Sequence, residues 1–369
     1  TRFKQLSISI LAGCLGASSY AQNADAKQNE QPIVEIEETK AKGKQPIENL
    51  DSYTTAESFR LDRPIEAIPR NITVIPESII DRQGAEDMTD VVLNNASVQP
   101  GDNYLKRYKI RGFDATLATN GVPLADFANN TYFNETAYTK KVEIIKGPAS
   151  ILYGSLRPGG VINRVTKKPQ AEQRVEAGTS LGVGEDGQDL FEGRFDWTGA
   201  ITENEEFKGR IIGLARERES FRDFIDQEEY LIAPSLSYTP SESFELLAEI
   251  VYEEEEGFLD RGIPAAPAIG ASANQDGIAP VDKTTNLQEP DDSYENENFS
   301  ANVRAKKEFG ENLTISAQGF YQDFEETRDS TDFIAQSTRT IANPVLGPLA
   351  PGSVGRFDND QVNENQLYG

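Results

Sequence analysis

The chain has 369 residues and a formal net charge of −25, from 36 Lys and Arg against 61 Asp and Glu. This acidic balance argues against a nucleic-acid partner, because phosphate backbones are bound by surplus Lys and Arg. With no His and one Cys, the chain cannot form a His-based triad or metal site, an internal disulfide or a cysteine zinc site. No apolar run reaches the roughly 18 residues of a spanning helix, but the mean hydropathy of −0.54 is compatible with a membrane barrel, whose strands alternate.

The first residues have the pattern of an export signal. A basic start precedes an apolar stretch from Leu6 to Ala17, and Ser19-Tyr20-Ala21 fits the rule of small residues at a cleavage site. Residues 1–21 are therefore predicted to be a signal peptide. A lipoprotein cleavage box with Cys14 as the lipid acceptor remains the alternative.

Residues 22–50 are polar and charged, and they contain too few large apolar residues to build a core. We interpret them as a periplasmic tether. Within it, Pro32 to Glu37 has the composition of a short strand. A lone strand on an arm can add to the sheet edge of a partner protein, and the alternative is an inert linker.

Residues 51–170 have the mixed pattern of a small α+β domain. Met88, Val91 and Val92 share one face at helical spacing. We expect two short helices over 76–83 and 85–95 and short strands at 71–75, 108–111 and 141–146.

From about residue 171 the pattern changes to strict alternation, with apolar side chains on one face and polar or ionic ones on the other. Such a pattern predicts antiparallel strands. Seven candidates lie near 174–184, 191–201, 206–217, 229–238, 244–254, 299–309 and 313–322, and the last residues have the pattern of entry into an eighth. Their length suits a tilted membrane strand of about 9–11 residues.

Two features favour a membrane barrel over a soluble sandwich. Short connections such as Thr202–Glu206 alternate with long loops at Gly257–Ser293 and Glu325–Asn363, as in outer-membrane barrels. In addition, the ionic face stays ionic along a whole strand, which a dry core would not tolerate. Aromatic residues near strand ends are placed as an interfacial girdle would be, namely Trp197, Phe207, Tyr238, Phe244, Phe309 and Tyr321.

The segment from Lys141 to Pro169, KVEIIKGPASILYGSLRPGGVINRVTKKP, resembles the plug-domain signature of TonB-dependent outer-membrane receptors of the ferric-siderophore branch. Two upstream stretches, Asp87–Val98 and Tyr108–Asp114, agree with it. The following Asn120-Gly-Val-Pro also agrees, except that Asn120 stands where the family usually has Asp. The resemblance implies a small α+β plug domain over 51–170, followed by an antiparallel transmembrane β-barrel that begins in 171–369, with about seven strands here.

By the same resemblance, Ile33, Val34, Glu35 and Ile36 would form the TonB box. Arg111 and Lys146 match two positions that lock the plug to barrel carboxylates. Ligand contact is expected on outward plug loops, where aromatic faces and amide donors suit a chelate. The candidates are Asn103, Tyr104, Arg107, Phe127, Asn130, Tyr132 and Phe133.

The implied function is active import of a ferric siderophore across the outer membrane of a Gram-negative-type bacterium. The partners would be a TonB-type energy-coupling protein, the siderophore and outer-membrane lipid. No catalytic residue, cofactor or metal ligand is expected, because the iron arrives as a chelate. The alternatives are the same transporter class with other cargo, such as cobalamin, a glycan or another metal complex, or a soluble secreted β-rich binding protein.

Overall fold

The computed structural model describes residues 71–368, except for 102–106, 125–134, 148–156, 185–188, 259, 261, 264–280, 287, 291, 311–312, 334–341, 344–346 and 349–353. From residue 330 onward it describes the backbone alone. The predicted signal peptide, the tether and Ile33–Ile36 lie outside the described residues.

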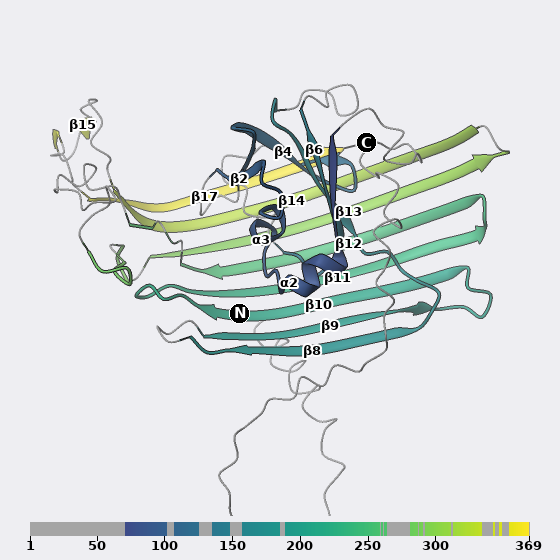
Figure 1. Cartoon of the computed structure of the whole chain (residues 1–369), viewed down its shortest axis with the longest axis horizontal. Helices are drawn as coiled ribbons and strands as arrows, with labels where there is room; N and C mark the ends of the chain where they lie inside the picture. The colour runs from purple at the N-terminus through teal and green to yellow at the C-terminus, as the bar shows by residue number, and fades with distance from the viewer. Residues whose placement is uncertain are drawn as a thin grey trace, which may run out of the picture. The chain divides into compact units, whose positions relative to one another are not determined.

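Residues 72–166 form a seven-stranded sheet with two helices (Figure 1). Its elements are β1 (Ile72–Pro76), α2 (Glu77–Gln83), α3 (Met88–Val92), β2 (Val98–Pro100), β3 (Tyr108–Ile110), β4 (Phe113–Thr119), β5 (Val122–Pro123), β6 (Thr139–Lys146) and β7 (Gly160–Thr166). The strand order is β1-β6-β7-β4-β3-β2, with β5 paired to β4. Only the β4–β7 pair is parallel among these strands.

The local sequence explains where α2 ends and where α3 begins. α2 stops at Gly84, which is left-handed (φ 58°) and donates its N–H to the carbonyl of Asp81. α3 begins after Asp87, whose side chain accepts the N–H of Asp90 at 3.1 Å. The helical face predicted from spacing is confirmed, because Met88, Val91 and Val92 are fully buried.

Position 160, which follows Pro158 and Gly159, requires a glycine for a steric reason. It opens β7 at a φ of 128°, and a Cβ at this position would lie 2.0 Å from the carbonyl oxygen of Ile145 on β6. β6 and β7 are buried on both faces, so their backbones approach closely where a side chain would prevent it.

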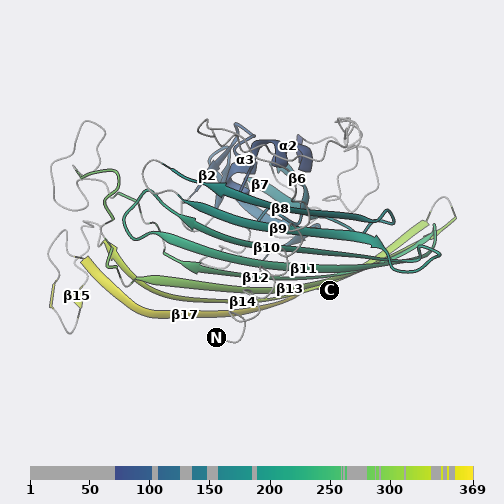
Figure 2. The ribbon, with the colours of Figure 1, turned by 90° about the horizontal axis from the view of Figure 1, so that it is seen from below.

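Residues 174–368 contribute an eight-stranded antiparallel sheet, which we call the wall. Its strands are β8 (Arg174–Gly182), β9 (Leu190–Ala200), β10 (Phe207–Glu219), β11 (Asp226–Ser241), β12 (Phe244–Gly257), β13 (Ser293–Phe309), β14 (Leu313–Phe333) and β17 (Val354–Tyr368). Each pairs with its sequence neighbour (Figure 2). A small separate ladder joins β15 (Ala342–Asn343) and β16 (Gly347–Pro348).

The register places the exposed apolar side chains on one face of the wall and the buried ionic ones, together with buried apolar residues, on the other. Large apolar side chains on the first face are exposed, including Ile232, Val303 and Ile315 at 48%, 49% and 54%. This exposed apolar surface, far larger than scattered single residues, is the surface expected against lipid. We call it the outward face, and the opposite one, which carries Glu192 and Glu249, the inward face.

Aromatic side chains on the outward face form two rows. Phe207 stacks on Tyr238 with ring centroids 4.4 Å apart, and Tyr238 meets Phe244 edge-on at 6.3 Å. Further along the strands, Phe299 and Tyr321 lie 6.3 Å apart. The stretch from Tyr230 to Tyr238 has nine residues, which matches a tilted membrane crossing.

The wall strands are longer than the alternation indicates, because they reach 21 residues in β14. The loop expected between Glu325 and Asn363 is therefore wrong in its bounds: β14 continues to Phe333 and β17 begins at Val354. Beyond the apolar band both faces are polar, so the alternation fades although backbone pairing continues. The long connection from Gly257 to Ser293 is confirmed. None of the described helices is long and apolar enough to span a membrane.

Replacing Gly160 with Ala should destabilise the first sheet by about 2–3 kcal/mol, because the new methyl group meets the Ile145 carbonyl and the positive φ is strained. The check is hydrogen exchange of the β6 and β7 amides in the intact protein. Gly84→Ala is the matched control, since its Cβ would meet nothing within 4 Å, and it should lose only about 1 kcal/mol. Equal losses at the two positions would contradict the steric explanation.

Candidate functional site

Apolar contacts join the first sheet to the inward face of the wall. Phe320 and Phe324 of β14 belong to the same buried cluster as Met88 and Ile110. On another part of the wall, Tyr138 packs with a second buried cluster. The wall members of that cluster are Ile212, Leu214, Leu231, Ala233 and Val251.

Glu249 of β12 is the centre of one polar contact between the two sheets. Asn120 donates from Nδ2 to its Oε2 at 3.1 Å, and the hydroxyl of Thr166 donates to its Oε1. On the wall side, Asn302 of β13 donates to Oε2 at 2.7 Å. Glu249 is 7% exposed, so these donors replace the water that the carboxylate loses on burial.

Arg216 of β10 is the centre of a second contact. Its Nη1 lies 3.0 Å from Oε2 of Glu135, which precedes β6, and also contacts Glu229 of β11. Its Nε donates to Glu192 of β9 at 2.8 Å. Burial raises the pKa of Glu135 above its ordinary value, with a further increase from nearby Glu229, although Arg216 opposes both.

A third set of charges lies where β7 leads into the wall. Arg210 binds Asp196 through two hydrogen bonds of 2.9 and 2.6 Å, and its Nη1 donates to the backbone carbonyl of Lys168 at 3.1 Å. The two oxygens of Glu77 lie 2.9 Å from the ammonium groups of Lys167 and Lys140. Burial opposes the charge on Glu77, but the two lysines outweigh it and hold its pKa below the ordinary 4.5.

Of the residues proposed from sequence, only Arg107, Arg111 and Lys146 are described. Arg111 is exposed at a φ of 53°, and Arg107 and Lys146 are half-buried. Among the described residues, no hydrogen bond or ion pair joins the side chain of Arg111 or Lys146 to the wall, so the lock stays a prediction. The remaining candidates lie outside the described residues: Asn103, Tyr104, Phe127, Asn130, Tyr132, Phe133 and the TonB-box segment.

Sequence reasoning did not select Glu135, Arg216 or Glu249. The sequence feature that could have identified Glu249 is its place in the alternation of side chains between the two faces of the strand. Glu249 lies between the apolar residues Leu247 and Val251 on the inward face, inside the stretch that crosses the membrane, and such a carboxylate needs a partner.

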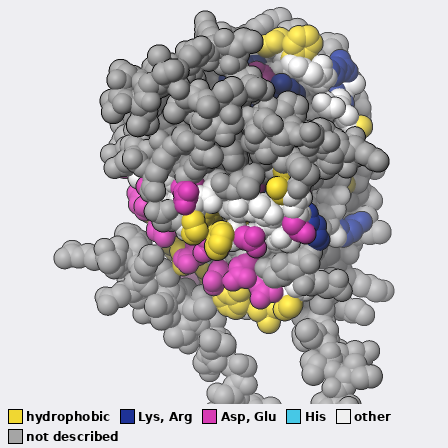
Figure 3. All heavy atoms as spheres, turned by 90° about the vertical axis from the view of Figure 1, so that its left-hand side faces the viewer, with side chains coloured by type: hydrophobic (Ala, Val, Ile, Leu, Met, Phe, Trp, Pro, Cys, Tyr) yellow, Lys and Arg dark blue, Asp and Glu magenta, His cyan; other side chains and the backbone are white. Residues whose placement is uncertain are grey.

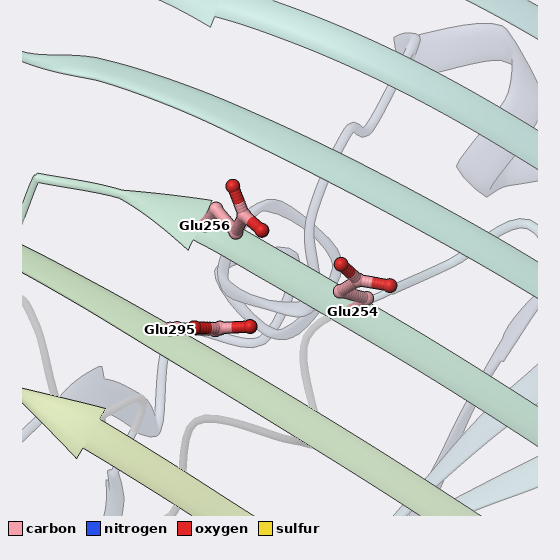
Figure 4. A group of neighbouring side chains, drawn as sticks. All are labelled: Glu254, Glu256 and Glu295. Atoms are coloured by element: carbon pink, nitrogen blue, oxygen red, sulfur yellow. The ribbon is translucent and has the colours of Figure 1, made fainter. Parts of the chain in front are cut away.

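The outward face is acidic beyond the aromatic row of Phe299 and Tyr321. Figure 3, which views the left-hand side of Figure 1, shows acidic side chains gathered beside apolar ones. Glu254 and Glu256 of β12 and Glu295 of β13 place carboxylate oxygens within 4.8 Å of one another (Figure 4). Exposed acidic groups are common without an ion, and we assign this cluster no ligand.

A folded α+β unit held by buried polar contacts against a wall with a lipid-facing surface defines the class of plug-and-barrel outer-membrane receptors. Residues 64–161 match the family model of the TonB-dependent receptor plug domain. This part of the chain is thus a TonB-dependent receptor plug domain, and the chain as a whole is similar to outer-membrane siderophore receptors.

The curated relatives are similar over most of this chain. The metal-pseudopaline receptor CntO of Pseudomonas aeruginosa is 27% identical over 322 residues, which cover 86% of this chain and 43% of that protein. The catecholate siderophore receptor Fiu of Escherichia coli K12 is 25% identical over 331 residues, covering 84% and 41%. The chain therefore spans less than half the length of these relatives.

Solved structures show the same fold. The closed form of Fiu from Escherichia coli superimposes with a TM-score of 0.69 at 22% identity, over 85% of this chain and 45% of that one. BauA, the ferric preacinetobactin receptor of Acinetobacter baumannii, gives 0.63 at 21% identity, over 75% and 41%. We call the α+β unit the plug from here on.

Asn120→Asp should loosen the plug by about 2–4 kcal/mol, because the new carboxylate lacks the Nδ2 donors and lies beside buried Glu249. The measurement is the urea concentration at which the plug amides of the intact receptor lose hydrogen-exchange protection. Adding Glu249→Gln restores a donor and should recover most of the loss. A double variant as loose as the single one would contradict the assignment.

Glu77→Gln should destabilise the α2 region at pH 7 by about 1 kcal/mol. Because the folded pKa of Glu77 is lowered, its stabilising effect is present above pH 4.5 and is lost as the pH falls through and below that value. Hydrogen exchange of the α2 amides as a function of pH provides the check. The variant and the parent should converge at low pH, and a constant difference would contradict the pairing with Lys140 and Lys167.

Proposed function

We propose that this receptor imports a ferric siderophore across the outer membrane by TonB-dependent active transport. The observation that carries the proposal is the plug itself, which packs on the inward face of the wall through two buried clusters and the contacts at Glu249 and Arg216. A plug fastened in this way blocks diffusion through the lumen, so passage of a solute requires the plug to move.

The relatives support the choice of cargo class. Catecholate, ferrichrome and ferrioxamine receptors all match this chain at 24–27% identity. In this proposal the chelate binds to the outward plug loops, and the chain performs no chemistry on it. The iron keeps the ligands of the siderophore, so the receptor needs aromatic and amide contacts and no metal ligand of its own.

A second cargo class is favoured by one observation. The relative CntO is a receptor for a metal–pseudopaline complex. The same transport mechanism would then serve a chelate of a different metal, and the two candidates differ only in what the outward loops bind.

Energy coupling is proposed to depend on residues 33–36. An extended Ile33-Val34-Glu35-Ile36 segment pairs with a sheet edge of a TonB-type protein on the periplasmic side, and main-chain hydrogen bonds supply most of the affinity. Pulling on this arm is the step that moves the plug.

Val34→Pro should abolish uptake without abolishing cargo binding, because proline removes one main-chain donor from the added strand. Cells that express the receptor from its own gene are given a radiolabelled ferric catecholate, a ferric hydroxamate and nickel or zinc chelates in parallel. We expect a fall in uptake of more than about tenfold for the cargo that is bound.

The control is Lys40→Pro, which changes the same arm outside the box and should leave uptake unchanged. Uptake that survives Val34→Pro would rule out coupling through this segment. Binding of a nickel or zinc chelate in preference to both ferric chelates would select the second cargo class.

A further inference from the structure

Arg216 has ion-pair partners within the wall besides its plug partner. Its Nε donates to Glu192 on one neighbouring strand at 2.8 Å, and its Nη1 contacts Glu229 on the other. Arg216 is 3% exposed, so a lone charge here would be strongly destabilising. Departure of Glu135 leaves the guanidinium paired with two carboxylates.

Glu135 likewise keeps partners within the plug. Its Oε1 accepts the backbone N–H groups of Thr136 at 2.7 Å and Ala137 at 2.8 Å, and only Oε2 reaches Arg216. These two donors travel with the carboxylate when the plug moves. Separation of Glu135 from Arg216 therefore breaks one ion pair and leaves each of the two charges with a partner; the neighbouring Arg218 of β10 has its own plug partner, Glu86, at 3.2 Å.

Glu229 competes directly with Glu135. Both contact the same Nη1 of Arg216, and two carboxylates that share one donor repel each other. A cavity of about 40 Å³ borders both residues, together with Leu214 and Asn298. This volume admits water, which can hydrate the carboxylate that is displaced.

The contact at Glu249 has the opposite character. Among the residues that the structure describes, its Oε1 accepts from Thr166 of the plug alone, and its Oε2 is shared between Asn120 of the plug and Asn302 of the wall. When the plug leaves, one oxygen of a buried carboxylate loses its hydrogen bond. Separation here is therefore costly, and Glu249 holds the plug.

We propose that the Glu135–Arg216 contact is the point at which the plug separates from this part of the wall, and that Glu229 takes over Nη1 of Arg216 as Glu135 departs. This release role rests on the proposed import function, whereas the ease of separation is a property of the receptor that is measurable without cargo.

Glu229→Gln tests the proposal because it removes the competing charge and its repulsion, so Arg216 should hold Glu135 more tightly. The full-length receptor is placed in planar lipid bilayers, urea is added, and the rate at which an ion-conducting pore opens is measured. We expect opening about tenfold slower than in the parent, the effect of a contacting ionic neighbour. Glu228→Gln is the matched control, on the same strand but on the outward face, and it should open at the parental rate.

Two further variants keep the test independent of how Glu229→Gln folds. Glu135→Asp keeps the charge but shortens the reach to Arg216, so its pore should open faster. Glu249→Gln weakens the holding contact and should also open faster. The double variant Glu135→Gln/Glu229→Gln should open no more slowly than Glu135→Gln alone, because no carboxylate remains on the plug side to be held.

Faster opening in Glu229→Gln would mean that Glu229 merely supports the wall, and it would overturn the proposal. An unchanged rate in both Glu229→Gln and Glu135→Asp would overturn it as well. If the expected signs are found but no chelate is taken up by cells, the proposed cargo fails while the separable contact stands.

Discussion

The requirement that every buried charge keep a partner governs this structure. A strand that crosses a membrane offers one face to lipid, where a charge is very unfavourable, so the polar residues of each strand collect on the other face. In the wall, Glu192, Arg216 and Glu249 are buried on that face, where the plug replaces water as their surroundings. The polarity of the plug–wall interface therefore follows from the lipid on the opposite side of the same sheet.

That requirement is met in two ways, and the difference has a mechanical consequence. Where wall residues neutralise one another across neighbouring strands, as around Arg216, the plug contributes an additional contact that separates at low cost. Where a wall carboxylate depends on plug donors, as Glu249 does, the plug is held. The same types of residue thus produce contacts of unequal strength, according to how many partners lie on the wall side.

The sequence alone predicts much of this architecture. Alternation found the wall strands, and spacing found the α3 face of Met88 and Val92. It underestimated strand length, since β14 runs on to Phe333 after its outward face ceases to be apolar. The reason for this error is physical. The alternation of apolar and polar residues marks the part of a strand that lies in lipid, whereas the ends of the strand are set by hydrogen bonding to the neighbouring strand.

Partnerships across the interface are beyond such reasoning, since Glu135 and Arg216 are 81 positions apart and their meeting depends on the fold of both sheets. Asn120 takes part in one such partnership across the interface. Asn120 stands where the family usually has Asp, and its Nδ2 donates to Thr166 and to Glu249. An amide can face a buried carboxylate as a donor, which an ionised carboxylate of the same shape cannot do. The contact therefore joins a plug amide to a wall carboxylate 129 positions away in the sequence.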